Sequence, residues 1–398
     1  MISAKPLSSA PEAVEGNPFV RYRTRLDSYR RWVDAGGSDA EFVTLVEHLN
    51  AKVADVDGVG FVVTPISEQP ALAEAIGLPS CRLWVKDETN NVSGSHKARH
   101  LFGLLLHLAV DERFGDNSAG ELAIASCGNA AIGAAVVAKA AGRPLRVFIP
   151  TWADANVAES LAELGATVEV VARQPGELGD PTYLRFVEAV ANGSTAFSVQ
   201  GTVAPHALDG GRTIGWELAE QFGYLAKRDQ QMARLDYVSI QVGGGALGSA
   251  MAMGLADGVE ARWLAAMPRI EAVQTAAAAP LKRAWDKLVA VDDPLSALAS
   301  RPDDFMTPWE NVGTSLATGI LDDVTYDWRQ LAAAMLTTGG SPVVVDEAAI
   351  VEAHKVGRAT TGINVSATGT SGLAGLLSKS DDAIRGANVA VIFTGVER

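Results

Sequence analysis

Nine short apolar runs alternate with alanine- and leucine-rich helical windows over most of this chain. Strand–helix alternation of this kind is typical of parallel sheets whose two faces are covered by helices. The predicted strands are residues 82–86, 122–126, 145–149, 167–171, 196–199, 237–242, 270–274, 342–345 and 388–393, and helical windows include 130–141, 155–164 and 347–359.

We therefore predict an α/β protein with two domains, each a mainly parallel twisted sheet flanked by helices. Nine strands are too many for one small compact sheet, and 398 residues suffice for two domains that share a cleft. Residues 17–57 are predicted to form two further helices ahead of the first strand. In parallel sheets, ligands bind beyond the carboxyl ends of the strands, so the functional residues are sought there.

Charge and composition narrow the possible partners. The net charge of −14 argues against nucleic acid and against an anionic membrane surface. No apolar stretch reaches membrane-spanning length, and the scattered histidines predict no metal site. Cys81 and Cys127 are too few for a disulfide framework, and residues 1–17 lack the pattern of a secretory signal, so we expect a cytoplasmic protein.

A glycine-rich loop follows the predicted strand 237–242 and opens a helix. Its glycines permit positive φ and leave backbone amides bare, so a phosphate can approach the helix N-terminus. The candidate phosphate-binding residues are Gly243, Gly244, Gly245, Ala246 and Leu247.

Two other interpretations of this loop stay open. Gly243, Gly245 and Gly248 also match the glycine spacing of a dinucleotide-binding turn. That turn needs an acidic residue at the end of the next strand to hold a ribose hydroxyl, whereas Glu271 stands at the beginning of that strand. The loop could also be a tight structural turn without a ligand.

Lys97 precedes the apolar run 101–106, which predicts a buried helix start. Burial disfavours the ammonium form, lowers the lysine pKa and makes the neutral amine available to attack a carbonyl carbon. A lone lysine is more often a solvated surface charge, so this assignment depends on the other motifs. His96 could donate to a phosphate oxygen or simply pack beside the helix.

A polar turn follows the strand near residue 125 and opens another helix. Hydroxyl and amide groups at a helix N-terminus suit a carboxylate, although a simple helix cap is the alternative. Cys127 has no neighbouring histidine to act as a base, so we interpret it as a packing residue. Thr394, at the end of the last strand, could meet a cofactor ring nitrogen. The candidate substrate-binding residues are Ser126, Cys127, Gly128, Asn129 and Ala130.

Together these motifs predict one cofactor. A buried amine, a carboxylate-binding turn and a phosphate loop can jointly hold a phosphorylated aldehyde, which is the layout expected for pyridoxal 5'-phosphate (PLP). The set resembles the fold-type II PLP enzymes, the tryptophan synthase β-like superfamily, from about residue 64 to residue 394. The lysine segment of that family is matched by Lys86, Glu88, Gly94, Ser95, His96 and Lys97.

The resemblance implies a role for each motif. Lys97 would be the Schiff-base lysine, and the turn with Ser126, Gly128 and Asn129 would bind the substrate carboxylate, with Asn129 touching the phenolic oxygen of PLP. The glycine loop would cradle the phosphate, and Thr394 would face the pyridine nitrogen. Four further segments are similar to the threonine synthase and serine/threonine dehydratase group: 210–213, 272–274, 314–317 and 362–365.

The resemblance also implies a reaction and an assembly. We expect a lyase that removes the α-proton of a small L-amino acid and then a β-substituent, as a serine/threonine dehydratase or ammonia-lyase does. The alternative is a threonine synthase-like β- or γ-replacement on an activated amino acid. Residues 99–205 would form a small mobile domain, residues 1–98 and 206–398 the large PLP-binding domain, and the protein would be a homodimer with PLP in the cleft.

Overall fold

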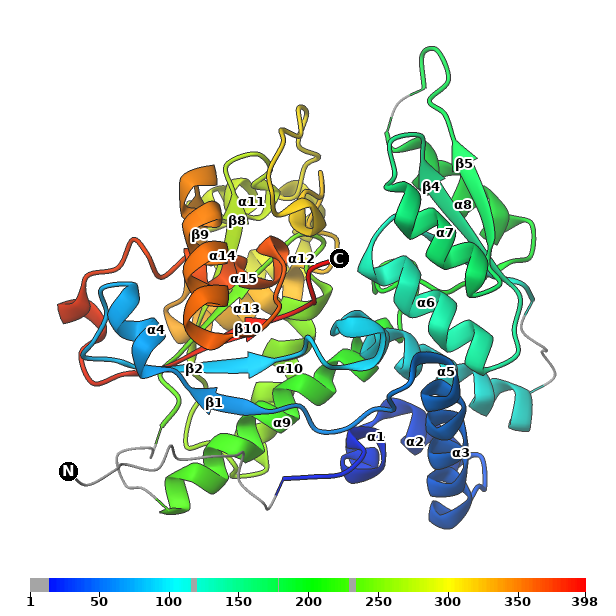
Figure 1. Ribbon diagram of the computed structural model, residues 1–398, viewed down its shortest axis with the longest axis horizontal. Helices are drawn as coiled ribbons and strands as arrows, with labels where there is room; N and C mark the ends of the chain where they lie inside the picture. The colour runs from blue at the N-terminus through cyan, green and yellow to red at the C-terminus, as the bar shows by residue number, and fades with distance from the viewer. Residues whose placement is uncertain (1–13, 116–119, 178, 229–233) are drawn as a thin grey trace.

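The fold contains two sheets with helices around each (Figure 1). The computed structural model describes residues 14–115, 120–177, 179–228 and 234–398. The larger sheet has the order β1-β2-β10-β7-β8-β9, and the smaller has the order β5-β4-β3-β6. Apart from the antiparallel β1–β2 pair, all strand pairs in the two sheets are parallel.

The strands lie where the apolar runs occur in the sequence. The larger sheet contains β1 (Ile66–Glu68), β2 (Arg82–Asp87), β7 (Tyr237–Gln241), β8 (Arg269–Thr275), β9 (Ser341–Val345) and β10 (Asn388–Phe393). The smaller sheet contains β3 (Leu122–Ala125), β4 (Leu145–Pro150), β5 (Thr167–Val171) and β6 (Thr195–Ala196). The prediction of two mainly parallel sheets flanked by helices is therefore confirmed.

Fifteen α-helices connect and cover these strands within the described residues. They are α1 (Pro18–Arg21), α2 (Asp27–Asp34), α3 (Asp39–Asp57), α4 (Pro70–Ala75), α5 (Lys97–Phe114), α6 (Asn129–Ala140), α7 (Ala155–Glu163), α8 (Pro181–Ala191), α9 (Ala207–Arg228), α10 (Ala246–Glu260), α11 (Pro280–Leu288), α12 (Pro294–Ser300), α13 (Arg329–Thr338), α14 (Glu347–Thr361) and α15 (Ala367–Ala374). None of these helices is long and apolar enough to cross a bilayer.

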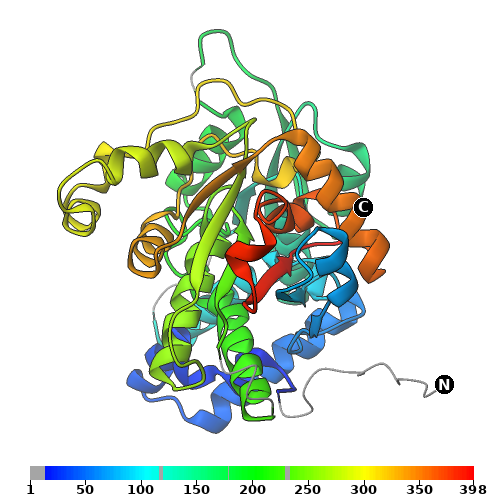
Figure 2. The same ribbon diagram turned by 90° about the vertical axis from the view of Figure 1, so that its left-hand side faces the viewer.

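The larger sheet is buried on both faces, as its continuous apolar strands require. On β10, Ala390 and Ile392 pack in the cluster that contains α9, α10 and α13. The alternate residues, among them Val391, pack in the cluster that contains α4, α14 and α15. Figure 2, turned by 90°, shows this sheet between its helices. Side chains of a strand alternate between the faces, so β10 is apolar at every position from Val389 to Phe393.

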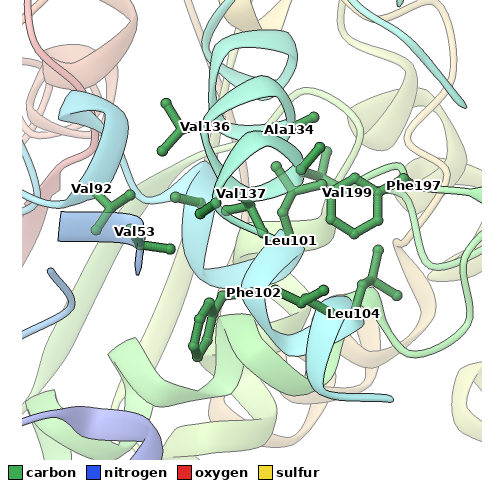
Figure 3. Packing of buried hydrophobic residues seen from close by; sticks show 14 of the residues in the cluster. Val53, Val92, Leu101, Phe102, Leu104, Ala134, Val136, Val137, Phe197 and Val199 are labelled. Atoms are coloured by element: carbon green, nitrogen blue, oxygen red, sulfur yellow. The ribbon is translucent and has the colours of Figure 1, made fainter. Parts of the chain in front are cut away.

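The N-terminal helices pack beside α5 and α6. Val53 of α3 lies in one apolar cluster with Leu101 and Phe102 of α5 and Val137 of α6 (Figure 3). This cluster extends to Phe197, after β6, so it is continuous with the helices of the smaller sheet. The domain boundaries at residues 98 and 206 stay a prediction.

Two details of the predicted elements were wrong. The strand predicted at 196–199 is the two-residue β6, because ladder pairing with β3 stops at Ala196 and a last bond joins the Phe197 amide to the Ala123 carbonyl. The segment 17–57 holds three α-helices and a 3₁₀ turn instead of two helices. The short antiparallel strand β1 was not predicted.

Candidate active site

Three of the motifs leave the larger sheet at the same edge. β2, β10 and β7 are adjacent and parallel, with Phe393 opposite Asp87 and Val391 opposite Ser239. The segments that follow these strands therefore begin side by side. They are the lysine segment, the residues after Phe393 and the glycine loop.

Contacts around Thr394 and Gly395 join the motifs. The backbone amide of His96 donates to the Thr394 carbonyl over 3.1 Å, and Gln241 Nε2 donates to Thr394 Oγ1 over 2.7 Å. A Cβ atom on Gly395 would lie 2.9 Å from Asn129 Nδ2 and 3.3 Å from Ser95 Cβ. The structure thus brings the lysine segment, the last strand and the Asn129 turn together, and a side chain at position 395 would displace the Asn129 amide.

Lys97 is the first residue of α5 and is half-buried. Burial lowers the pKa of its amine, and the carboxyl groups of Asp322 and Asp327 oppose this shift. Burial also raises the pKa of each of these aspartates to about 6. The neutral form of the Lys97 amine is therefore easier to reach than that of a solvent-exposed lysine.

His96 is buried beside Lys97, and its pKa lies well below the ordinary value because of this burial and the nearby Lys97 charge. Its Nδ1 lies 3.1 Å from the Thr394 carbonyl oxygen, which can only accept. The neutral ring therefore carries its proton on Nδ1, and its Nε2, which has no partner, is an acceptor. Donation by His96 to a phosphate oxygen would need the protonated ring, which its pKa disfavours.

His96 and His100 lie one helical turn apart, with ring centroids separated by 5.9 Å. The described residues nevertheless contain no group of three histidine, cysteine or acidic side chains placed to hold a metal ion.

The glycine loop ends at Gly245, the residue that directly precedes α10. Gly245 has a φ of 91°, in the left-handed region. Residues 320–327 cover the loop: the Asp327 amide donates to the Gly244 carbonyl over 2.8 Å. The Gly244 amide donates to the Asp322 carboxylate and opposes the rise of its pKa. A phosphate bound to this loop would therefore interact with the backbone amides at the start of α10, beginning with Ala246 and Leu247.

The turn after β3 opens α6 as expected. Gly128 precedes the helix, and its amide donates to Ser126 Oγ over 3.4 Å. A Cβ on Gly128 would meet no atom of the described residues within 4 Å, so this side of the turn is open to a ligand. Burial raises the pKa of the Cys127 thiol, which packs against the apolar cluster of α5 and α6. This agrees with a packing role for Cys127.

A fully buried charge network lies beneath the lysine segment. Lys86 Nζ and Arg99 Nη1 each lie 2.6 Å from the Glu217 carboxylate, and Arg99 Nε lies 2.8 Å from the Glu88 carboxylate. The two cations and two carboxylates balance each other, as buried charges must. A close crossing of α5 and α9 makes these contacts possible: a Cβ on Gly210 would lie 2.0 Å from the Arg99 carbonyl oxygen. The network fixes the backbone on both sides of Lys97.

The dinucleotide interpretation of the glycine loop fails. Glu271, the acidic residue of the next strand, is buried and paired with Lys379 Nζ at 2.7 Å. It lies near the beginning of β8, away from the loop, so it is not placed to hold a ribose hydroxyl.

The residues present fit a phosphorylated pyridine aldehyde. Lys97 supplies an amine, and the start of α10 supplies bare amides for the phosphate. Ser95 Oγ and His96 Nε2 are buried and have no hydrogen-bond partner among the described residues, so two polar atoms beside Lys97 remain able to bind a ligand. Thr394 Oγ1, which accepts from Gln241 Nε2, belongs to the contacts that join the last strand to the lysine segment.

The chain belongs to the pyridoxal-phosphate dependent enzymes, whose family model matches residues 59–395. Its architecture is that of fold type II, and the cofactor of the family is PLP. The chain is 26% identical over 393 residues to a threonine synthase of Synechocystis sp., covering 98% of this chain and 86% of the relative.

Two other similar proteins are a dehydratase and an ammonia-lyase. A biosynthetic L-threonine dehydratase of Haemophilus influenzae is 26% identical over 252 residues, which cover 63% of this chain and 42% of that protein. The structure of diaminopropionate ammonia-lyase from Escherichia coli superposes with a TM-score of 0.65 at 16% identity, covering 90% of this chain and 89% of that one. At this identity the structural likeness concerns the fold.

Four residues near the site were not predicted. Asp322 and Asp327 come from a segment far from the other motifs in sequence, and Arg398 reaches Asn129 from beyond the last strand. No local pattern marks these three. Gln241 had a signal, because it is a polar residue at the end of an apolar strand, two positions before the first glycine of the loop.

Proposed function

We propose that this protein is a PLP-dependent lyase that acts on a small, unphosphorylated L-amino acid. It would remove the α-proton and then a β-substituent, releasing a 2-oxo acid and ammonia. Bound PLP supplies an electron sink for the α-carbon. Lys97 Nζ, with its lowered pKa, would hold the cofactor and then take the α-proton.

The other residues would orient the substrate. The open start of α6, with Ser126, Gly128 and Asn129, suits the substrate carboxylate because it presents amides at the positive end of a helix. The proposed small domain, residues 99–205, would close on the larger one and exclude water. A contact between Asp327 Oδ2 and the Gly201 amide, 2.9 Å apart, joins these two parts beside the site.

One observation favours elimination from an uncharged side chain. The charges that act on Lys97 come from two carboxyl groups, Asp322 and Asp327. A phosphate ester on the substrate would add a second phosphate, besides that of PLP, near these two carboxyl groups, whereas a hydroxyl or amine leaving group would add no negative charge. An activated, phosphorylated amino acid is therefore the less favourable substrate.

A replacement reaction of the threonine synthase type is the second candidate. It is favoured by the similarity to a threonine synthase over 98% of this chain. In that case water or another nucleophile would enter after the leaving group has departed.

The test is an assay of 2-oxo acid release from L-threonine and L-serine by the purified protein with PLP. Rapid release that disappears in Lys97→Ala, but persists in the surface variant Lys139→Ala, supports the lyase. Phosphate release from a phosphorylated amino acid, without 2-oxo acid from either free amino acid, overturns it in favour of the replacement reaction. Turnover by Lys97→Ala would overturn both.

A further inference from the structure

Gln241 and Thr394 form a buried contact at the edge of the larger sheet. Gln241 is the last residue of β7, and Thr394 directly follows β10, the neighbouring parallel strand. Gln241 Nε2 lies 2.7 Å from Thr394 Oγ1, and both residues are less than 5% exposed.

The direction of this hydrogen bond is fixed by two further acceptors. Gln241 Nε2 also lies 3.0 Å from the Gly369 carbonyl oxygen and 3.2 Å from the Ile392 carbonyl oxygen. Carbonyl oxygens only accept, so the nitrogen end of the amide must occupy this position. The amide keeps this orientation although its Oε1 is buried without a partner. The amide nitrogen has two hydrogens for three oxygens and cannot itself accept, so Thr394 Oγ1, the nearest of the three at 2.7 Å, accepts one hydrogen and the two carbonyl oxygens share the other.

The hydroxyl hydrogen of Thr394 stays available. Among the described residues, no group accepts a hydrogen bond from Thr394 Oγ1. One lone pair of this oxygen is already taken by Gln241, so the hydroxyl is a better donor than acceptor. It suits a partner with a lone pair and no proton.

We propose that Gln241 is a positioning residue that fixes the Thr394 hydroxyl as a donor to the pyridine nitrogen of PLP and so keeps that nitrogen unprotonated. The proposal rests on the proposed function and on the role that the family resemblance implies for Thr394, in which its hydroxyl faces this nitrogen. A protonated ring nitrogen would need a hydrogen-bond acceptor at the position of Thr394 Oγ1. The Gln241 N–H already uses a lone pair of this oxygen, which makes it a poorer acceptor for the ring. An unprotonated ring withdraws electrons more weakly, which favours loss of a β-substituent over transamination.

The sheet offers a matched control for the structural part of this contact. Ser239, two residues earlier on β7, is also buried and donates to the Gly372 carbonyl over 2.7 Å. Gly369 and Gly372 both belong to α15, so Gln241→Leu and Ser239→Ala each remove a buried bond between β7 and α15. Only Gln241→Leu changes the surroundings of the Thr394 hydroxyl.

The experiment is ¹⁵N NMR of the protein loaded with PLP labelled at the ring nitrogen, combined with measurement of pyridoxamine phosphate formed per turnover. The wild type and Ser239→Ala should show an unprotonated nitrogen. Gln241→Leu should shift it toward the protonated form and raise transamination about tenfold, the effect of one ordinary hydrogen bond.

The outcomes separate this proposal from the proposed function. A protonated nitrogen in the wild type overturns the inference without any variant, as does a Gln241→Leu spectrum identical to that of Ser239→Ala. If Thr394→Ala changes the ring signal and Gln241→Leu does not, only the role of Gln241 is lost. If Thr394→Ala also leaves the signal unchanged, Thr394 does not face the nitrogen and the proposed site itself is wrong.

Discussion

Arg398 donates from Nε to Oδ1 of Asn129 over 3.0 Å. It also donates from its terminal nitrogen to the Ser93 carbonyl, so one side chain joins the Asn129 turn to the lysine segment. Because a guanidinium can only donate, Asn129 must present its oxygen to Arg398 and its Nδ2 hydrogens toward the region of Gly395. Arg398 thereby determines which end of the amide is available to a ligand.

Replacing Arg398 by Ala should weaken PLP binding because the amide of Asn129 is then free to turn. We expect a rise in the Kd for PLP of about tenfold, the usual size of a lost charge-assisted bond, with partial recovery in Arg398→Lys. Fluorescence titration with PLP measures it. Arg385→Ala, which removes an exposed arginine paired with Asp382, is the control and should bind PLP normally.

Gly395→Ala should disturb the site and leave the fold largely intact. The added Cβ would lie 2.9 Å from Asn129 Nδ2, so the amide must move. We expect PLP affinity to fall by more than about tenfold. Gly357→Ala crowds a buried helix position, 3.2 Å from Thr370 Cγ2, away from these contacts. Equal losses of affinity in the two variants would show that crowding alone is responsible.

Glu217→Gln should strongly destabilise the protein. The change leaves Lys86 and Arg99 buried with one carboxylate fewer, and breaking a buried ion pair costs about 3–5 kcal/mol. Urea unfolding followed by circular dichroism measures the loss. Glu220→Gln, one turn along α9, removes a more exposed partner of Arg21 and should cost about 1 kcal/mol or less. Similar losses in both variants would contradict the importance of the buried network.

Asp327 predicts a pH dependence of stability. Burial raises its pKa from 3.8 to about 6 in the folded protein. The folded state therefore favours the protonated form, and the resulting stability is present below about pH 4 and is lost as the pH rises through 6. Asp327→Asn keeps an acceptor for the Gly201 amide and removes this ionisation.

The free energy of unfolding of Asp327→Asn, relative to wild type, should therefore increase between about pH 4 and about pH 8. A shift of this size corresponds to roughly 3 kcal/mol at most. Urea unfolding at the two pH values measures the change. A difference between variant and wild type that does not vary with pH would show that Asp327 titrates normally.

The sequence allowed the sheets and the site edge to be predicted for a physical reason. β10 is a continuous apolar run from Val389 to Phe393, and β2 and β7 each contain shorter apolar runs, so the strands can be recognised, and parallel strands bring their carboxyl ends together. That places Thr394 beside the lysine segment and the glycine loop. By contrast, β1 has three residues, too few for any pattern, and β6 ends where its pairing with β3 ends.

Tertiary contacts set the remainder of the site. The Asp322 and Asp327 carboxyl groups approach Lys97 only because residues 320–327 fold over the glycine loop. The partners of Arg99 depend on the close crossing at Gly210, which no local pattern reveals. The homodimer and the cytoplasmic location concern surfaces and surroundings outside one folded chain, and they stay predictions.

The position of β10 has a consequence for biosynthesis. It is the last described strand in the sequence but lies third in the sheet, between β2 and β7. Until the ribosome has released residues 388–393, β2 and β7 each expose an unpaired edge, and such edges promote association with other chains. Because Thr394 follows this strand, a nascent chain cannot assemble the site. Capture of the cofactor is therefore a late event that cannot assist earlier stages of folding.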